Sequence, residues 1–494
     1  MKRWISAILA GLMLTSALAA CSDAPAEDTA QDTSAADTTT VVTEPRETER
    51  HEIKDSLPDN LNFGGKTWSI YVSTANAYNA YVAGQEEKEG DIVNDAVWER
   101  NLKVQERLSF KMDPVAYADT YKNNHTNVSA LILSGDKTFD LIMGMQTSMP
   151  QLIPQRMFVN AYDLEHIDFD QPWWANDFMN ELALGSEYRY LMVSDFNTEV
   201  ISRIRVNFFN KALYQNLYGD PNELYQKVLD GKWLLDDMQE LIKGAYKDVN
   251  GDGIVDFNDQ LGLYCNQMYA TTDAFVFGSD VEFYTRDKDG FVELKMINDD
   301  AIALCERLNS FWYEKGVNTQ ANKGPSDLDK FKQGSVLFIT CQMANSGSLR
   351  DMEEDFGFLP YPKFDAEQKE YRTLVHDTAQ LSCVPVSSDS IDISGAILEA
   401  LSAESYRTVT TAYYESALKL KYARDDISSQ MIDLMRDTMT TNFVYAYNYA
   451  LNGLGLVYRT LLTKNSTDYV STVQGLLAAG ETKLAEQIKA FKGE

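Results

Sequence analysis

One stretch of the sequence carries oxygen-bearing side chains at short, regular intervals. In residues 248–259 such side chains stand at positions 1, 3, 5, 9 and 12, and Gly253 holds position 6. Position 7 is Ile254, which can offer only its backbone carbonyl. This is the spacing of a 12-residue calcium loop, where a hard cation takes about six to eight oxygens. The predicted Ca²⁺ ligands are Asp248, Asn250, Asp252, Ile254, Asp256 and Asp259.

The last position of this loop differs from the usual pattern. Asp259 stands where a glutamate is usual, and its shorter side chain makes bidentate closure around the ion less favourable. We therefore expect modest affinity and a structural ion, which holds a long connection in place and adds to stability by binding the folded state. The alternative is an acidic, glycine-rich turn between two helices that holds no ion.

The composition describes an acidic, globular protein. The 494 residues, of which 44% are hydrophobic, suffice for two or three domains with cores of their own. The formal net charge of −30 repels phosphate backbones, so we expect no nucleic-acid partner. Cys265, Cys305, Cys341 and Cys383 show no metal-binding spacing. We expect them to be buried free thiols, although the sequence also allows one disulfide.

The N-terminus has the pattern of an export signal. Two basic residues precede an apolar run at 5–17, which is shorter than a membrane-spanning helix needs. The signal, residues 1–20, ends in the sequence LAAC, which resembles a bacterial lipobox with Cys21 as the lipidated first residue of the mature chain. The alternative is an ordinary signal peptide that happens to precede a cysteine. Residues 21–58 are acidic and poor in large apolar side chains, which predicts a disordered tether.

The part of the chain after the tether alternates between strands and helices. We expect strands at 66–73, 108–112 and 139–143, with helices at 91–108 and 128–134 between them. This alternation predicts a parallel α/β sheet.

A second region repeats the α/β pattern, with buried strands expected at 204–209 and 335–340. From residue 391 onward the pattern is mostly helical. Further expected elements are a strand at 188–194, helices at 211–217, 221–230, 235–246 and 299–313, and a hairpin within 278–294.

Several short segments occur once each, in a fixed order, between about residues 60 and 420. They are GDIVNDAVWERN (90–101), TFDLI (138–142), PWW (172–174), FFNK (208–211), GKWLLDD (231–237), the 248–259 loop, LGL (261–263), GSVLF (334–338) and FLPYP (358–362). Together with the lipobox and the tether, this order resembles the bacterial extracellular solute-binding proteins of the carbohydrate type, which are the lipoprotein receptors of ABC importers.

The resemblance implies an α/β fold of two lobes, of the periplasmic-binding-protein type II kind, with the ligand in the cleft between the lobes. Lobe 1 is expected at 59–164 together with 376–420, lobe 2 at 165–375, and C-terminal helices at 421–494. The resemblance also implies a monomeric receptor rather than an enzyme. It would be held at the outer face of the membrane by its lipid and would deliver a carbohydrate, in our expectation an oligosaccharide, to a permease.

A sugar receptor needs aromatic platforms for C–H faces and planar polar groups for hydroxyls, placed at the carboxyl ends of strands. Two adjacent tryptophans do not both face inward easily, so we expect Trp173 or Trp174 to be exposed in the cleft. Asp140 could instead cap a helix, and Trp312 could belong to the core. The candidate ligand-binding residues are Tyr78, Asp140, Trp173, Trp174, Asp195, Trp312, Gln342 and Asp377.

Three other functions fit parts of the sequence. A dockerin-like module would share the acidic loop but carries two copies of it, and this chain has one copy in mid-chain. A surface carbohydrate-active enzyme needs only paired carboxylates, but the chain has no G-x-S-x-G or H-E-x-x-H motif and only 4 histidines. A binding protein for a solute other than a sugar, such as a peptide or a polyamine, would share the two-lobed fold.

Overall fold

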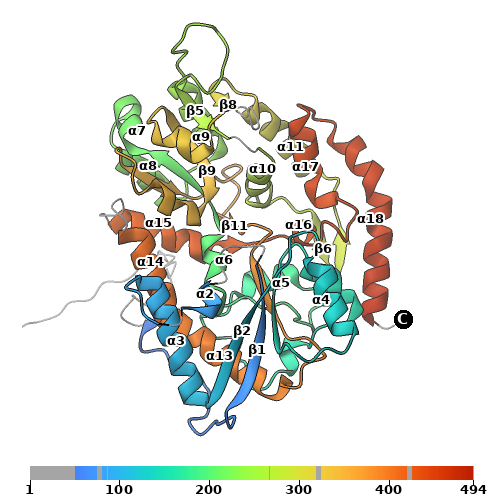
Figure 1. Cartoon of the computed structure of the whole chain (residues 1–494). Helices are drawn as coiled ribbons and strands as arrows, with labels where there is room; N and C mark the ends of the chain where they lie inside the picture. Colours follow the sequence, from blue (N-terminus) through green and yellow to red (C-terminus); the bar gives the residue numbers. More distant parts are fainter. Residues whose placement is uncertain are drawn as a thin grey trace, which may run out of the picture. The chain divides into compact units, whose positions relative to one another are not determined.

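Two β-sheets organise the chain, which we describe from a computed structural model (Figure 1). The structure describes residues 50–74, 80–85, 87–265, 268–318, 324–419 and 426–492. The predictions for the signal peptide, for Cys21, for most of the tether and for Tyr78 lie outside these residues.

The first sheet is mostly parallel, as the alternation of strands and helices predicts. Its four strands stand in the order β12-β3-β1-β2, and β12 alone is antiparallel to its neighbour. The strands are β1 (Lys66–Ser73), β2 (Phe110–Tyr117), β3 (Leu141–Met145) and β12 (Gln380–Cys383).

Helix α3 (Ile92–Leu108) follows β1 and buries one face. Asp91 begins it by accepting the N–H groups of two residues in the first turn, and Val97 and Val104 lie on the buried side. Helix α13 (Ile391–Glu404) packs against α3. The shorter helices of this part are α2 (Ala80–Ala83) and α4 (Asn124–Leu133).

The second sheet is mixed and has five strands in the order β10-β4-β9-β5-β8. Its strands are β4 (Arg205–Asn210), β5 (Leu261–Tyr264), β8 (Val317–Asn318), β9 (Val336–Gln342) and β10 (Phe356–Leu359). The helices between these strands are α7 (Lys211–Tyr218), α8 (Pro221–Leu229), α9 (Leu235–Ala245), α10 (Met268–Phe277), α11 (Asp299–Trp312) and α12 (Asp327–Lys332).

The segment between the sheets packs on the first sheet, and the chain enters the second sheet only near residue 203. The strand expected at 188–194 is reduced to two isolated bridges, one between Ser194 and Trp174 and one in which the backbone groups of Met192 and Ser382 exchange hydrogen bonds of 2.8 and 2.9 Å. Up to residue 202, the segment that we expected in lobe 2 from residue 165 therefore belongs with the first sheet, where it lies beside β12. Its elements are η1 (Met149–Gln155), η2 (Ala161–Asp163), α5 (Asn176–Leu182), η3 (Asp195–Asn197) and α6 (Glu199–Ser202).

The C-terminal part is helical, and its last helix is hydrogen-bonded at both ends to segments that lie earlier in the chain. Helix α18 (Tyr469–Lys492) begins where the Tyr469 hydroxyl donates to the carbonyl of Met296, at 2.7 Å. It ends where Arg156 of the segment after β3 donates to the carbonyl of Phe491, at 2.6 Å. The remaining elements are β6 (Tyr284–Arg286), β7 (Val292–Leu294), η4 (Met343–Leu349), β11 (Thr373–Leu374), the π-helical turn η5 (Ser405–Val409), α14 (Thr410–Lys419), α15 (Asp426–Asp437), β13 (Met439–Thr440), α16 (Phe443–Ala446), η6 (Leu454–Leu456) and α17 (Val457–Thr463).

The four cysteines after the tether are in the predicted state. Cys265, Cys305, Cys341 and Cys383 are free and buried, which confirms the reading of them as buried thiols. In the part of the chain that the structure describes, no helix combines the length and the apolarity needed to cross a membrane.

The glycine of the LGL segment, Gly262 in β5, has a packing role, because the backbone of α9 lies directly against it. A Cβ atom at this position would stand 2.2 Å from the carbonyl oxygen of Ile242. We expect Gly262→Ala to lower the free energy of unfolding by about 3 kcal/mol, measured by urea denaturation, because two backbone segments must separate.

Gly475→Ala is the matched control for this substitution. Gly475 lies in α18, and an added Cβ there meets no heavy atom within 4 Å. The change should leave stability equal or raise it by up to about 1 kcal/mol. Equal effects of the two substitutions would contradict the close approach of α9 to β5.

Candidate functional site

Three segments of the chain run side by side where it passes between the two sheets. They are residues 203–205, 373–377 and 438–441, and backbone hydrogen bonds join them. The N–H of His376 donates to the carbonyl of Arg203 at 3.1 Å, and the N–H of Val375 donates to that of Thr440 at 3.0 Å. We call these the crossing segments. The carboxyl ends of β1, β3 and β9 lie beside them, which is where α/β folds place ligands.

A buried ion pair ties the end of β9 to the start of β12. Arg203 donates to Glu199 at 2.9 Å through Nε and to Oε1 of Gln342 at 3.0 Å through Nη1. The other carboxylate oxygen of Glu199 accepts the backbone N–H of Gln380 at 2.9 Å. Burial raises the pKa of Glu199 above its usual value, and the guanidinium of Arg203 opposes this shift. Each partner would be a costly buried charge without the other.

A second polar group lies at the next crossing segment. Arg459 from α17 donates to Asp273 of α10 at 2.7 Å and stands 3.9 Å from the carboxylate of Asp377. Burial raises the pKa of Asp273 to about 6, although Arg459 lowers it. Burial also lowers the pKa of His376 to about 4, so its imidazole is neutral at pH 7 and hydrogen-bonds through Nδ1 to the hydroxyl of Thr378.

These groups retain accessible surface at the strand ends. The exposed side-chain fractions are 23% for Asp377, 20% for Arg459 and 18% for His376, and Gln342 is half-buried. The imidazole of His376 and the guanidinium of Arg459 lie 3.1 and 3.9 Å from the carboxylate of Asp377, and Arg203 links the amide of Gln342 to this group. Such planar groups are suited to hydrogen-bonding a polar solute, since they present donors and acceptors in fixed directions. We define Gln342, His376, Asp377 and Arg459 as the interlobe site.

Of the residues proposed from the sequence that the structure describes, only Gln342 and Asp377 come together here. Arg203 connects them, because it donates to the Gln342 side chain and its carbonyl accepts the N–H of His376. Arg203, Asp273, His376 and Arg459 were missed. The one local signal for Arg203 is a glutamate and an arginine four residues apart, Glu199 and Arg203, with two apolar residues directly after the glutamate.

The expectation that one of Trp173 and Trp174 is exposed is wrong, because their exposed fractions are 1% and 5%. The two indoles face different interior partners. Trp174 donates through Nε1 to Glu399 of α13 at 3.0 Å, and Trp173 lies 6.2 Å from the ring of Tyr406 in the helical turn after α13. Both rings are used inside the first lobe, which leaves them no surface for a ligand.

Asp195 belongs to the same interior region and is also buried. Its N–H donates to the carbonyl of Trp173 at 2.9 Å, and its carboxylate accepts from Thr410 at 3.0 Å. Arg436 stands 3.4 Å away. Burial raises the pKa of Asp195, and Arg436 opposes the shift. The carboxylate joins the C-terminal helices to the first lobe and does not face the interlobe site.

Asp140 and Trp312 lie away from the interlobe site, so the ligand role expected for them is not supported by their positions. Asp140 precedes β3, at the amino end of the strand, and accepts from Ser69 N–H at 2.9 Å and from the Ser388 hydroxyl at 2.7 Å. Trp312 is 1% exposed and packs in the core with its ring 5.7 Å from that of Phe275.

The 248–259 loop is closed by hydrogen bonds among its own groups. The carboxylate of Asp248 accepts the N–H of Gly251 at 2.6 Å and of Gly253 at 3.0 Å, and Gly253 has a φ of +74°. Asp259 is buried and accepts the N–H of Val249 at 3.1 Å. Among the described residues, no three carboxylate, imidazole or thiol groups converge as metal ligands. Calcium binding by this loop stays a prediction.

Comparison with known proteins identifies the fold. No protein-family model matches the sequence, and neither does any curated protein. The sugar-binding protein MalE from Xanthomonas citri is similar in structure, with a TM-score of 0.58 at 12% identity, over 87% of this chain and 100% of that one. So is the lacto-N-biose-binding protein of a Bifidobacterium longum ABC transporter, with 0.55 at 12% identity, over 87% and 98%.

A cyclo/maltodextrin-binding protein complexed with maltotetraose is similar as well. Its TM-score is 0.53 at 10% identity, over 87% of this chain and 97% of that chain. At such low identities the likeness establishes the fold alone. The chain therefore has the two-lobed α/β fold of periplasmic binding proteins, and the prediction of that fold is confirmed.

Calcium binding can be tested by thermal unfolding in the presence and absence of the ion. If calcium binds the folded loop, excess Ca²⁺ raises the melting temperature of the protein over that in chelator, because binding to the folded state alone stabilises it. Asp248→Ala should abolish the difference. An equal melting temperature with Ca²⁺ and with chelator contradicts the prediction.

Glu399 gives a pH-dependent test of the buried tryptophan pair. Burial raises its pKa to about 7 from an ordinary value of 4.5, although the indole of Trp174 opposes the shift. A raised carboxyl pKa adds stability at low pH, which is lost as pH rises from about 4.5 through about 7. In Glu399→Gln, the decline of unfolding free energy over this range should be smaller by about 2 kcal/mol. Urea denaturation at several pH values measures this decline. An identical decline in the wild type and in Glu399→Gln would contradict the raised pKa of Glu399.

Proposed function

We propose that this chain is the substrate-binding lipoprotein of an ABC importer, which captures a carbohydrate between its lobes and delivers it to a membrane permease. The observation that carries the proposal is the interlobe site, where charged and amide groups gather at the strand ends beside the crossing segments. The fold supports it, because the similar solved proteins include ones described as sugar-binding and as parts of ABC transporters.

The chemistry of the site suits hydroxyl groups. Each sugar hydroxyl can donate one hydrogen bond and accept others, so it needs acceptors and donors close together. Asp377 accepts, Arg459 donates and Gln342 can do both. A ligand that contacts Gln342 of the second lobe and Asp377 next to the first would bind the closed arrangement better than the open one. Its differential affinity would shift the lobes towards closure.

The remaining parts of the proposal come from the sequence. Tyr78 follows β1, whose carboxyl end lies beside the crossing segments, and it is our proposed aromatic platform. A lipid on Cys21 would anchor the chain at the outer face of the membrane, and the chain would act as a monomer. Calcium in the 248–259 loop would stabilise lobe 2 without contacting the solute.

Direct binding measurements test the proposed function. Isothermal titration calorimetry of the full chain against mono- and oligosaccharides, beginning with maltotetraose and lacto-N-biose, should find saturable binding. Asp377→Asn should weaken that binding at least about tenfold, since hydrogen bonds to a charged group contribute about 1.5–3 kcal/mol. Glu367→Gln, an exposed change of the same charge on the loop after β10, should leave affinity unchanged.

The outcomes separate the competing functions. No saturable binding to any saccharide, with binding to a peptide or polyamine instead, would contradict the carbohydrate class. Steady hydrolysis of an oligosaccharide by the wild-type protein would indicate an enzyme. Equal affinity of the wild type and Asp377→Asn would remove Asp377 from the site.

A further inference from the structure

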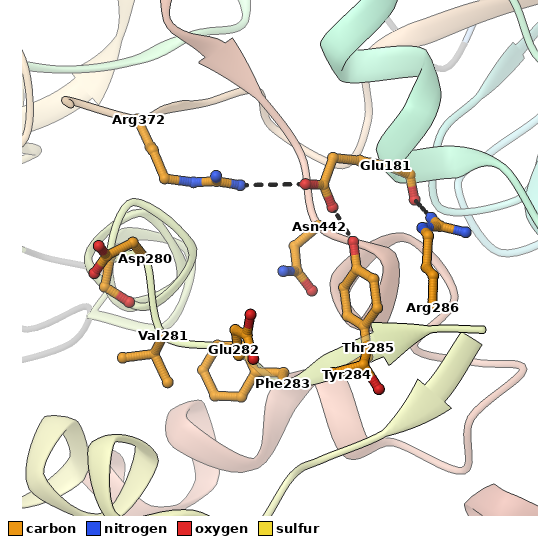
Figure 2. Close-up of a pocket in the computed structure, with 11 residues that line it drawn as sticks. Glu181, Asp280, Val281, Glu282, Phe283, Tyr284, Thr285, Arg286, Arg372 and Asn442 are labelled. Carbon is orange, nitrogen blue, oxygen red and sulfur yellow. Dashed lines mark hydrogen bonds and ion pairs between the residues drawn. The ribbon is translucent and has the colours of Figure 1, made fainter. Parts of the chain in front are cut away.

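A cavity lies at the other end of the crossing segments from the interlobe site. It has a volume of about 380 Å³, within the range of small-molecule sites (Figure 2). It shares none of the four residues of the interlobe site. Arg372, which lines it, lies five positions before Asp377 in nearly extended chain, or about 16 Å away at the rise of a β-strand.

Four separate parts of the chain form its walls. Glu181 comes from α5, and residues 279–286 come from β6 and the connection between α10 and β6. Arg372 directly precedes β11, and Asn442 follows β13 by two residues. The cavity is therefore bounded by residues that flank two crossing segments, by α5 of the first lobe and by β6 with the connection before it.

One wall of this cavity is held in place by hydrogen bonds. Arg286 donates to the carbonyl of Ala183 at 2.7 Å and to that of Asn180 at 2.9 Å, which fixes β6 against α5. The hydroxyl of Tyr284 donates to the carboxylate of Glu181 (Figure 2). Because its groups are already positioned, the cavity would lose little conformational entropy when a solute binds.

The other wall carries polar side-chain groups that have no partner among the described residues. Asp280 and Glu282 have exposed carboxylates, and among the described residues neither side chain has a hydrogen-bond or ion-pair partner (Figure 2). Asn442 uses its Oδ1 to accept the N–H of Val444 at 2.9 Å, so its Nδ2 remains for a solute. Figure 2 shows this amide pointing into the space among Arg372, Asp280 and Glu282.

The mixture of groups selects the class of solute. Carboxylate acceptors face an amide and a guanidinium donor across the cavity, and a hydroxyl can satisfy both kinds of partner. A metal ion fits poorly, because among the described residues no three acidic, imidazole or thiol groups converge. A free cation would also meet the guanidinium of Arg372, which stands 3.4 Å from Glu181. A neutral polyol needs no change in that ion pair.

We propose that this cavity is a second solute site, which takes a small neutral polyol or a single sugar unit and acts on the crossing segments. Arg372 joins three elements: it precedes β11, pairs with Glu181 of α5 and donates to the Thr440 hydroxyl of β13 at 3.2 Å. A solute held by Arg372 and Asn442 touches the residues that directly flank two crossing segments, 373–377 and 438–441. It therefore changes the balance between lobe arrangements and, by linkage, the affinity of the interlobe site. This proposal does not depend on the interlobe site binding a carbohydrate.

The experiment uses the full chain carrying Asp377→Asn, so that the interlobe site contributes little signal. Sorbitol, glucose and maltose are the probes, and ligand-observed NMR titration measures affinity. At least one probe should still bind saturably. Adding D280N and E282Q should weaken it at least tenfold, and E282Q alone should weaken it less. The control pair, E481Q and E486Q, makes the same charge change at exposed positions of α18 and should have no effect.

Three results would overturn the proposal: no saturable binding of any probe, unchanged affinity after D280N and E282Q, or a response to putrescine or lysine without one to the neutral probes. Circular dichroism melting of each variant confirms that it is folded, which we expect because Asp280 and Glu282 hold no structural contact among the described residues. Loss of oligosaccharide binding by the wild type, with polyol binding intact in Asp377→Asn, would reject the interlobe site alone.

Discussion

The backbone hydrogen bonds among the three crossing segments are the constraint on which the rest of the structure depends. These segments are largely buried, so their N–H and C=O groups must find partners inside the protein. They find one another: the N–H of His376 donates to the carbonyl of Arg203, and the N–H of Val375 donates to that of Thr440. This pairing sets where each lobe begins. It also fixes the positions from which Arg203 and Asp377 project, and the two sites at its ends follow from it.

Much of the fold could be predicted because its signals are local. The apolar strand 66–73, the amphipathic helix after Asp91 and the FFNK strand all occur within a few residues of the expected bounds. The lobe boundary was placed too early, because its signal is not local. Met192 behaves as an extension of the first sheet only because Ser382, 190 residues later, provides the partner. A short segment with mixed polarity does not reveal which sheet it will join.

The site was less predictable, for a physical reason. Aromatic and acidic residues at expected strand ends could line a cleft or could satisfy one another in the interior, and the sequence does not distinguish these. Trp174 donates to Glu399 on a helix 225 residues away, and Asp195 accepts from Thr410. Both side chains are therefore buried and do not reach the surface. Arg459 lies in the C-terminal region, where the family resemblance was weakest, yet it completes the interlobe site with Asp377.

Hydrogen–deuterium exchange of the crossing segments tests the central claim most directly. The claim is that a carbohydrate binds between the lobes at these segments and shifts the lobe equilibrium. With a saturating saccharide, the amides of 203–205 and 373–377 should exchange more slowly, since closure suppresses the local openings that expose them. Residues in α3, which touches neither site, should be unaffected. Saturable saccharide binding with unchanged exchange in both segments would contradict the account.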